Sequence, residues 1–112
     1  MKIAEIIKRL DLKLLAGKDD LPDEITGGYV SDLLSDVIGN AREGQIWITL
    51  QTHQNIVAVA SLKDLAAVIV VKGGVPEADT IEKANSEGIP VLSTALDTFT
   101  ITGRLFELLV RG

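Results

Sequence analysis

Two kinds of hydrophobic periodicity divide this chain into alternating helical and extended segments. Apolar residues spaced three and four positions apart fall on one side of an α-helix and predict helices. Alternating apolar residues, or short continuous apolar runs, predict strands. Helices are expected over residues 3–10, 33–38, 56–63, 77–87 and 98–111, and strands over residues 12–16, 25–30, 45–50, 67–71 and 90–93.

The residues between these segments have the chemistry of helix ends and turns. Ser, Thr, Asp and Asn cap the amino ends of helices, and Gly commonly ends them. Residues 17–24 are polar and acidic and include Pro22, so an exposed loop is expected there. The expected boundary residues are Ser31 or Asp32, Gly39 with Asn40, Asn55, Pro76, Gly88, and Asp97 or Thr98.

The spacing also predicts which helix faces are buried. The expected face of the second helix is Leu33, Leu34, Val37 and Ile38, and that of the last is Phe99, Thr102, Leu105, Phe106 and Leu109. The last helix is apolar beyond that stripe, with Ile101, Leu108 and Val110, although a helix on a sheet needs only one stripe. We therefore expect a homodimer that covers the second face, with Leu108→Glu as its probe.

The order of the segments indicates the fold class. From residue 45 onward, strands and helices alternate, which is typical of right-handed βαβ units. We expect an α/β fold with a largely parallel sheet of about five strands and helices on both faces, in a single domain over residues 1–112. Strand 12–16 is either antiparallel or at an edge, and the pattern leaves both open.

Composition excludes several classes of function. The chain has no cysteine, which rules out disulfides, zinc–thiolate sites and iron–sulfur ligation. Its net charge is −5 and its basic residues are scattered, so neither nucleic acid nor an anionic membrane is an expected partner. The longest apolar run, Leu65–Val71, is too short to span a bilayer. No signal peptide is evident, and a cytoplasmic location is expected.

A polar loop between a buried strand and an apolar helix is the strongest candidate binding site. It holds Thr49, Gln51, Thr52, His53 and Asn55. Ligands of open α/β sheets bind at the carboxyl ends of strands, and the next helix would offer free amides to an anion. Ser93 and Thr94 occupy the equivalent place after the last strand. The alternative is that all these residues serve only as caps and turns.

Three blocks of the sequence resemble the DRTGG domain family. They are Glu24–Ser35, which contains Thr26-Gly27-Gly28, then Ile46–His53, then Gly88–Thr94. The resemblance implies an α/β domain like the N-terminal domain of HPr kinase/phosphorylase, found also beside CBS domains and in some phosphotransacetylases. Such domains are accessory to a larger metabolic system, iron-hydrogenase clusters of anaerobes among them. Glu24 and Ile25 replace the Asp-Arg of the family name, so the arginine is lost.

The Thr26-Gly27-Gly28 segment has two interpretations. The glycines could let a ligand approach the backbone, with these residues as a wall beside the Thr49–Asn55 loop. Alternatively they form a bend that lets a helix and a strand pack closely. The acidic residues Asp19, Asp20, Asp23 and Glu24 lack the spacing of a calcium loop, so no metal site is expected.

Enzyme motifs are missing, and we expect a non-enzymatic protein. The preferred hypothesis is a ligand-sensing or regulatory module for an anionic metabolite or nucleotide. One alternative is a protein-interaction subunit with no ligand of its own, partnered by a metabolic enzyme or hydrogenase system. A less favoured alternative is an enzyme whose general base is His53, the only histidine.

Overall fold

The expected alternation of strands and helices is present in the computed structural model, which describes residues 1–19 and 24–111. Asp20 and Asp23 of the acidic loop lie outside the described residues. The strands are β1 (Lys13–Ala16), β2 (Gly27–Val30), β3 (Gln45–Thr49), β4 (Ala67–Val70) and β5 (Val91–Ser93). The helices are α1 (Ile3–Arg9), α2 (Leu34–Asn40), α3 (Asn55–Leu62), α4 (Ala78–Glu87) and α5 (Thr98–Arg111).

The five strands form one sheet in the order β1-β5-β4-β3-β2. Strands β2 to β5 are parallel neighbours, and β1 runs antiparallel to β5. The first strand is therefore both antiparallel and at an edge, so both options that the pattern left open hold. The largely parallel sheet predicted from the sequence is confirmed.

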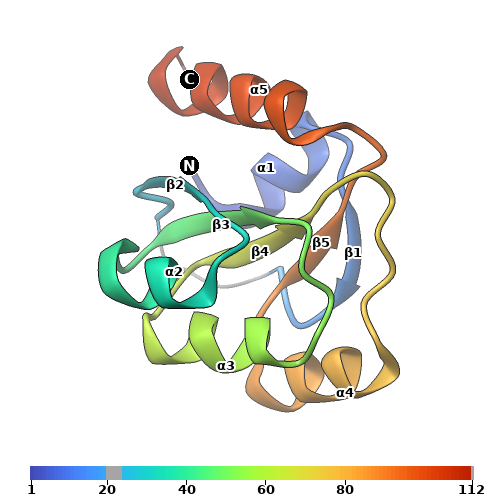
Figure 1. Cartoon of the computed structure of the whole chain (residues 1–112). Helices are drawn as coiled ribbons and strands as arrows, with labels where there is room; N and C mark the ends of the chain where they lie inside the picture. Colours follow the sequence, from blue (N-terminus) through green and yellow to red (C-terminus); the bar gives the residue numbers. More distant parts are fainter. Residues whose placement is uncertain (20–23, 112) are drawn as a thin grey trace.

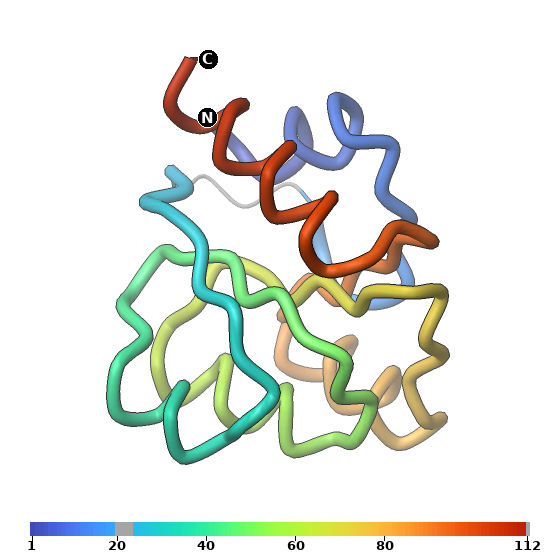
Figure 2. The backbone as a smooth tube through the Cα atoms, turned by 45° about the horizontal axis from the view of Figure 1, so that its top comes forward, coloured from blue at the N-terminus to red at the C-terminus, as the bar shows by residue number. Residues whose placement is uncertain are grey.

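Helices cover both faces of the sheet, as expected (Figure 1). Helices α2, α3 and α4 lie side by side on one face, and α1 and α5 lie together on the other (Figures 1 and 2). The three crossover helices share a face because β2 to β5 are laid down in sequential order and each crossover has the same hand. Among the described helices, none is long and apolar enough to cross a membrane.

The sheet separates two hydrophobic clusters. On β3, Ile46 and Ile48 point to the side of α1 and α5, whereas Trp47 points to the side of α2 to α4. This alternation follows from the two-residue period of a strand. Every residue of β4 is buried, because this strand is central and covered on both faces. The sheet is thus stabilised by apolar packing on both faces as well as by the hydrogen bonds between its short strands.

Several helix boundaries differ from the expectation. Gly39 and Asn40 belong to α2, which ends at Asn40 instead of before Gly39. The α4 helix begins at Ala78, so Pro76 precedes it and is not its first residue. Gly88 ends α4 in the left-handed conformation, as predicted. Of the two caps predicted for α5, Asp97 or Thr98, Asp97 is the one used, and its Oδ1 accepts the amide hydrogen of Thr100 at 2.7 Å.

The exposed faces of two helices were partly mispredicted. In α5 the buried residues are Ile101, Leu105 and Leu108, while Phe99 and Phe106 are 90% and 67% exposed. Leu108 packs in the cluster with α1, so Leu108→Glu would damage the protomer and is not a probe of a second face. Leu33 and Ile38, expected inside, are also exposed. Helical spacing identifies apolar stripes but does not show which stripe the sheet covers.

Candidate functional site

Asp32 organises the carboxyl ends of β2 and β3. Its Oδ1 accepts hydrogen bonds from the Thr49 hydroxyl at 2.9 Å and the Leu50 amide at 2.7 Å. The side-chain amide of Gln51 donates to the Asp32 carbonyl oxygen at 2.8 Å. Thr49 and Gln51, two predicted site residues, are thus engaged within the protein. Asp32 is not a helix cap, because its carboxylate turns to β3, and the hydroxyl of Ser31 accepts the amide hydrogen of Leu33.

The loop after β3 is anchored at both ends. The exposed ring of His53 accepts the amide hydrogen of Asn55 on Nδ1 at 3.1 Å, so His53 and not Asn55 caps the start of α3. That bond uses one of the amides expected to be free for an anion. The carbonyl oxygen of Thr52 accepts from the Thr80 hydroxyl at 2.8 Å and the Glu77 amide at 3.2 Å, which fixes the loop to α4.

The connections after β4 and β5 leave toward opposite faces of the sheet. One leads to α4 and the other to α5, the arrangement at which open α/β sheets bind ligands. Here the two loops are bridged, because the Lys72 amide donates to Leu96 O at 2.9 Å and the Gly73 amide to Thr94 O at 2.8 Å. Ser93 pairs with Lys13 and Val70 in the sheet, and Thr94 is buried.

Lys72 has an unusual backbone at this position. Its φ is +58°, in the left-handed region that residues with a side chain rarely occupy. Its side chain is exposed. The pKa of Asp97 is lowered chiefly by the hydrogen bond from the Thr100 amide, and the charge of Lys72 lowers it further. Lys72 was not among the residues predicted from the sequence. The signal that could have identified it is a basic residue before Gly73-Gly74 at the end of a strand.

The Thr26-Gly27-Gly28 segment lies where the parallel strands begin, which we call the amino edge of the sheet; the carboxyl edge is where these strands end. Gly27 pairs with Gln45 in the parallel ladder, so this segment is at the amino end of β2, whereas Thr49 is at the carboxyl end of β3. The expectation that it forms a wall beside the Thr49–Asn55 loop is therefore wrong. The Thr26 hydroxyl donates to Glu43 O at 2.9 Å and is engaged within the protein.

Gly28 explains the close approach of α5 to the sheet. A Cβ at this position would lie 3.4 Å from Cδ2 of Leu105 and 3.6 Å from Ile46 O. The alternative interpretation, in which the glycines serve helix–strand packing, thus has a direct contact in its support.

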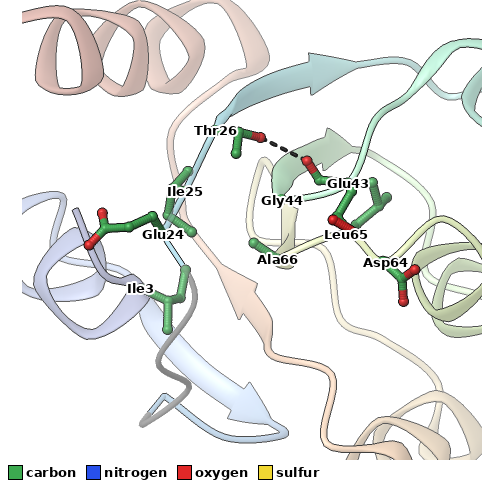
Figure 3. A pocket seen from close by; sticks show the side chains of 9 residues that line it. All are labelled: Ile3, Glu24, Ile25, Thr26, Glu43, Gly44, Asp64, Leu65 and Ala66. Atoms are coloured by element: carbon green, nitrogen blue, oxygen red, sulfur yellow. Dashed lines mark hydrogen bonds between the residues drawn. The ribbon is translucent and has the colours of Figure 1, made fainter.

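A pocket of about 460 Å³ opens at this amino edge. Three carboxylates line it, from Glu24, Glu43 and Asp64, and Glu24 and Asp64 lie on opposite sides (Figure 3). Glu24 is paired with the amino group of Met1 and with Lys2, and the hydrogen bond to that amino group lowers the pKa of Glu24. Within residues 1–19 and 24–111, no three acidic or histidine side chains are arranged to hold a metal. The excess negative charge makes this pocket unfavourable for an anion.

A second concavity, which we call the β2–α5 groove, has a volume of about 410 Å³. Gly28 and Val30 line it from β2, and Thr102, Phe106 and Val110 from α5. None of its lining residues is charged. The Thr102 Oγ1 atom is buried there without a hydrogen-bond partner.

Comparison with known families decides the identity of the fold. The sequence profile of the DRTGG domain matches residues 5–108. This chain belongs to the DRTGG domain family. The resemblance inferred from the three sequence blocks is confirmed. No curated protein sequence matches the chain significantly.

A solved structure has the same DRTGG fold. It contains the CBS and DRTGG domains of the regulatory region of Clostridium perfringens pyrophosphatase, complexed with the activator diadenosine tetraphosphate. The TM-score is 0.69 at 22% identity, over 94% of this chain and 45% of the other. This chain thus spans less than half of the chain in that structure. The similarity supports the fold and leaves the ligand of this DRTGG domain to be inferred.

The two departures from the family name have a structural role here. Glu24 replaces the Asp and is held by the Met1 amino group. Ile25 replaces the Arg and packs against the cluster beneath α1 and α5. In this DRTGG domain the signature segment joins the amino terminus to the core, and its missing guanidinium leaves it without a positive charge for a phosphate.

Proposed function

We propose that this chain is a regulatory binding domain for a small anionic metabolite or nucleotide, with no catalytic activity of its own. Its membership of the DRTGG family carries the proposal. The similar solved structure supports it, since that structure is a regulatory region bound to a nucleotide activator.

Charge favours the carboxyl edge of the sheet over the amino edge as the ligand site. Glu24, Glu43 and Asp64 surround the pocket at the amino edge. At the carboxyl edge, Lys72 and His53 are both exposed, on the loops after β4 and β3. Asp32 occupies the β2 side of that edge and Asp97 lies near Lys72 after β5, so an anion would lie between them, at the loops after β3 and β4.

The two loops that carry Lys72 and His53 are in contact. The Glu77 amide donates to Thr52 O, and a Cβ on Gly74 would lie 3.6 Å from the methyl carbon of Thr52. Lys72 is in the left-handed backbone region, as is Asp64 at the amino-edge pocket, but lysine occupies that region more rarely than aspartate. The predicted residues that the proposal retains are Thr52 and His53, with Lys72 added.

Thermal unfolding with added ligand tests the proposal. The probes are ATP, diadenosine tetraphosphate and inorganic pyrophosphate, each over a concentration series. A ligand at a hundred times its dissociation constant stabilises the folded state by about 2.7 kcal/mol. If none of the three probes raises the unfolding temperature, the proposal of an anionic ligand is wrong.

Lys72→Gly is the informative variant. Glycine adopts the left-handed backbone without strain but lacks the ammonium group. We expect the variant to fold at least as stably as the wild type and to lose most of the ligand-induced shift. Lys63→Ala, which removes a lysine after the end of α3, is the matched control and should retain the shift. An unchanged shift in Lys72→Gly would exclude this location.

A second candidate function is protein interaction without a ligand. The exposure of Phe99, Phe106 and Val110 on α5 favours it, because exposed apolar surface commonly marks an interface. The family resemblance points to a metabolic enzyme as the kind of partner. A purified candidate enzyme that binds the wild type but not Phe99→Glu, with no response of either protein to the three probes, would favour this function.

A further inference from the structure

The two edges of the sheet differ in how they are protected. Strand β1 carries Lys13 and a register shift between Leu14 and Ala16, and both features discourage pairing with another chain. Strand β2 has the sequence Gly-Gly-Tyr-Val, with neither a charged residue nor a proline. Both edge strands are four residues long, but only β1 also has a charged residue and a register shift.

The outward backbone groups of β2 can be identified from its pairing with β3. The Ser31 amide donates to Ile48 O at 3.3 Å, and Tyr29 lies opposite Trp47. Because strand backbone groups alternate in direction, Tyr29 and Ser31 face β3, and Gly28 and Val30 face away. Among the described segments, none hydrogen-bonds to Gly28 or Val30 from that side.

These outward groups are complementary to themselves. In an antiparallel pair centred on Tyr29, Gly28 of each copy would lie opposite Val30 of the other. Each such pair exchanges two N–H···O bonds, so the four outward groups of one strand would all be used. A two-fold axis generates this arrangement without any further adjustment of register.

The surfaces beside the edge are apolar on both faces of the sheet. On one face, Phe106 and Val110 are 67% and 64% exposed beside Val30, at the β2–α5 groove. On the other face, Leu33 and Ile38 are exposed next to and on α2, the outermost helix of its layer. A two-fold axis perpendicular to the sheet brings each apolar surface against its own copy.

The β2–α5 groove offers a site for an apolar side chain of a second copy. The groove lies beside Gly28, where α5 is in close contact with the sheet, and each copy presents both this groove and the exposed ring of Phe106. The chain carries a net charge of −5, but none of it comes from residues that line the groove. Repulsion between two acidic copies is therefore weak where they would meet.

We propose that the chain forms a two-fold dimer in which β2 pairs antiparallel with β2 of a second copy, with Phe106 of each copy seated in the β2–α5 groove of the other. The dimer is independent of the ligand site, which lies at the carboxyl edge of the sheet.

Light scattering at high protein concentration tests the dimer. We expect twice the chain mass of 12.0 kDa for the wild type and a single chain mass for Phe106→Glu. Phe99→Glu is the matched control, because Phe99 is on the same helix and more exposed but does not line the groove. Circular dichroism verifies that both variants fold.

Three outcomes overturn the proposal. A monomeric wild type removes the dimer, and a dimeric Phe106→Glu places any contact elsewhere. Amide hydrogen exchange tests the strand pairing itself: the amides of Gly28 and Val30 should exchange slowly in the wild type and rapidly in Phe106→Glu. Rapid exchange at both amides in a dimeric wild type would mean that the helices associate without β2.

Discussion

Single glycines show how far local sequence rules extend in this protein. Gly17 has a φ of +83°, and its amide donates to Oδ1 of Asn85 at 2.8 Å. A Cβ there would lie 2.1 Å from the backbone oxygen of Ile89. Gly103 lies in α5 with nothing within 4 Å of its missing Cβ. The sequence does not distinguish the two, because their difference arises from contacts and backbone angles.

Substituting these two glycines should have opposite effects. We expect Gly17→Ala to lower the free energy of unfolding by more than about 1 kcal/mol, since the backbone of Ile89 cannot move aside cheaply. Gly103→Ala should raise it by roughly 0.5–1 kcal/mol, because alanine is the better helix former. Urea denaturation measures both. Equal effects of the two changes would contradict this account.

Asp97 links the cap of α5 to pH. The Thr100 amide lowers the pKa of Asp97 below its ordinary value of 3.8. The charged form is thus favoured by folding, and its stabilisation is present above the ordinary pKa and lost as the pH falls through the lowered one. Of the two predicted caps, Asp97 and Thr98, the structure uses Asp97, whose carboxylate accepts the Thr100 amide hydrogen.

Asp97→Asn should remove that pH dependence while retaining a cap. Asparagine is also a good cap, so we expect little change in the free energy of unfolding at pH 7. Below about pH 4 the variant should lose less stability than the wild type, because it has no carboxylate to protonate. Urea titrations at several pH values measure this. The account would be refuted if the free energy of unfolding of the two proteins fell equally as the pH is lowered below about 4.

At the scale of the element, all ten helices and strands among the described residues were predicted, and most boundaries lie within two residues. Periodicity was sufficient for this because the sheet buries both faces of β3 and β4 and one stripe of each helix. The failures have a common cause. The buried face of α5 depends on neighbouring elements, which a local pattern does not contain, and the His53 cap depends on a ring orientation that the pattern does not contain either.

The corrected face of α5 predicts a contrast between two of its residues. Leu108→Ala should lower the free energy of unfolding by about 2–5 kcal/mol, because Leu108 packs against α1 in the core. Phe99→Ala should change it by less than about 0.5 kcal/mol, since that ring is 90% exposed. Chemical denaturation compares them, and the reverse order would restore the stripe predicted from the sequence.

At the scale of the whole molecule, the candidate site was only partly predictable. The Thr49–Asn55 loop was correctly located at a strand end, but its polar groups form hydrogen bonds with one another and with Asp32. The signature glycines were assigned to the same site and lie at the other edge. Which strand ends meet depends on strand order, and the sequence alone left that order open.

A dimer through β2 also predicts that stability depends on protein concentration. Dilution releases the second copy, so the unfolding temperature of the wild type should fall as the protein is diluted. The unfolding temperature of Phe106→Glu should be independent of concentration. Calorimetry over a concentration series measures both, and a wild type insensitive to dilution would oppose the dimer.

The pairing of β1 with β5 has a consequence for synthesis on the ribosome. Lys13 in the first strand pairs with Ser93 in the last strand, so β1 cannot join the sheet until β5 has been synthesised. At about 5–20 residues per second, this delay is roughly 4–16 seconds. During that time Ile3 and Ile6, whose cover includes α5, are exposed on the nascent chain. The apolar face of α1 therefore stays uncovered until α5 has been synthesised.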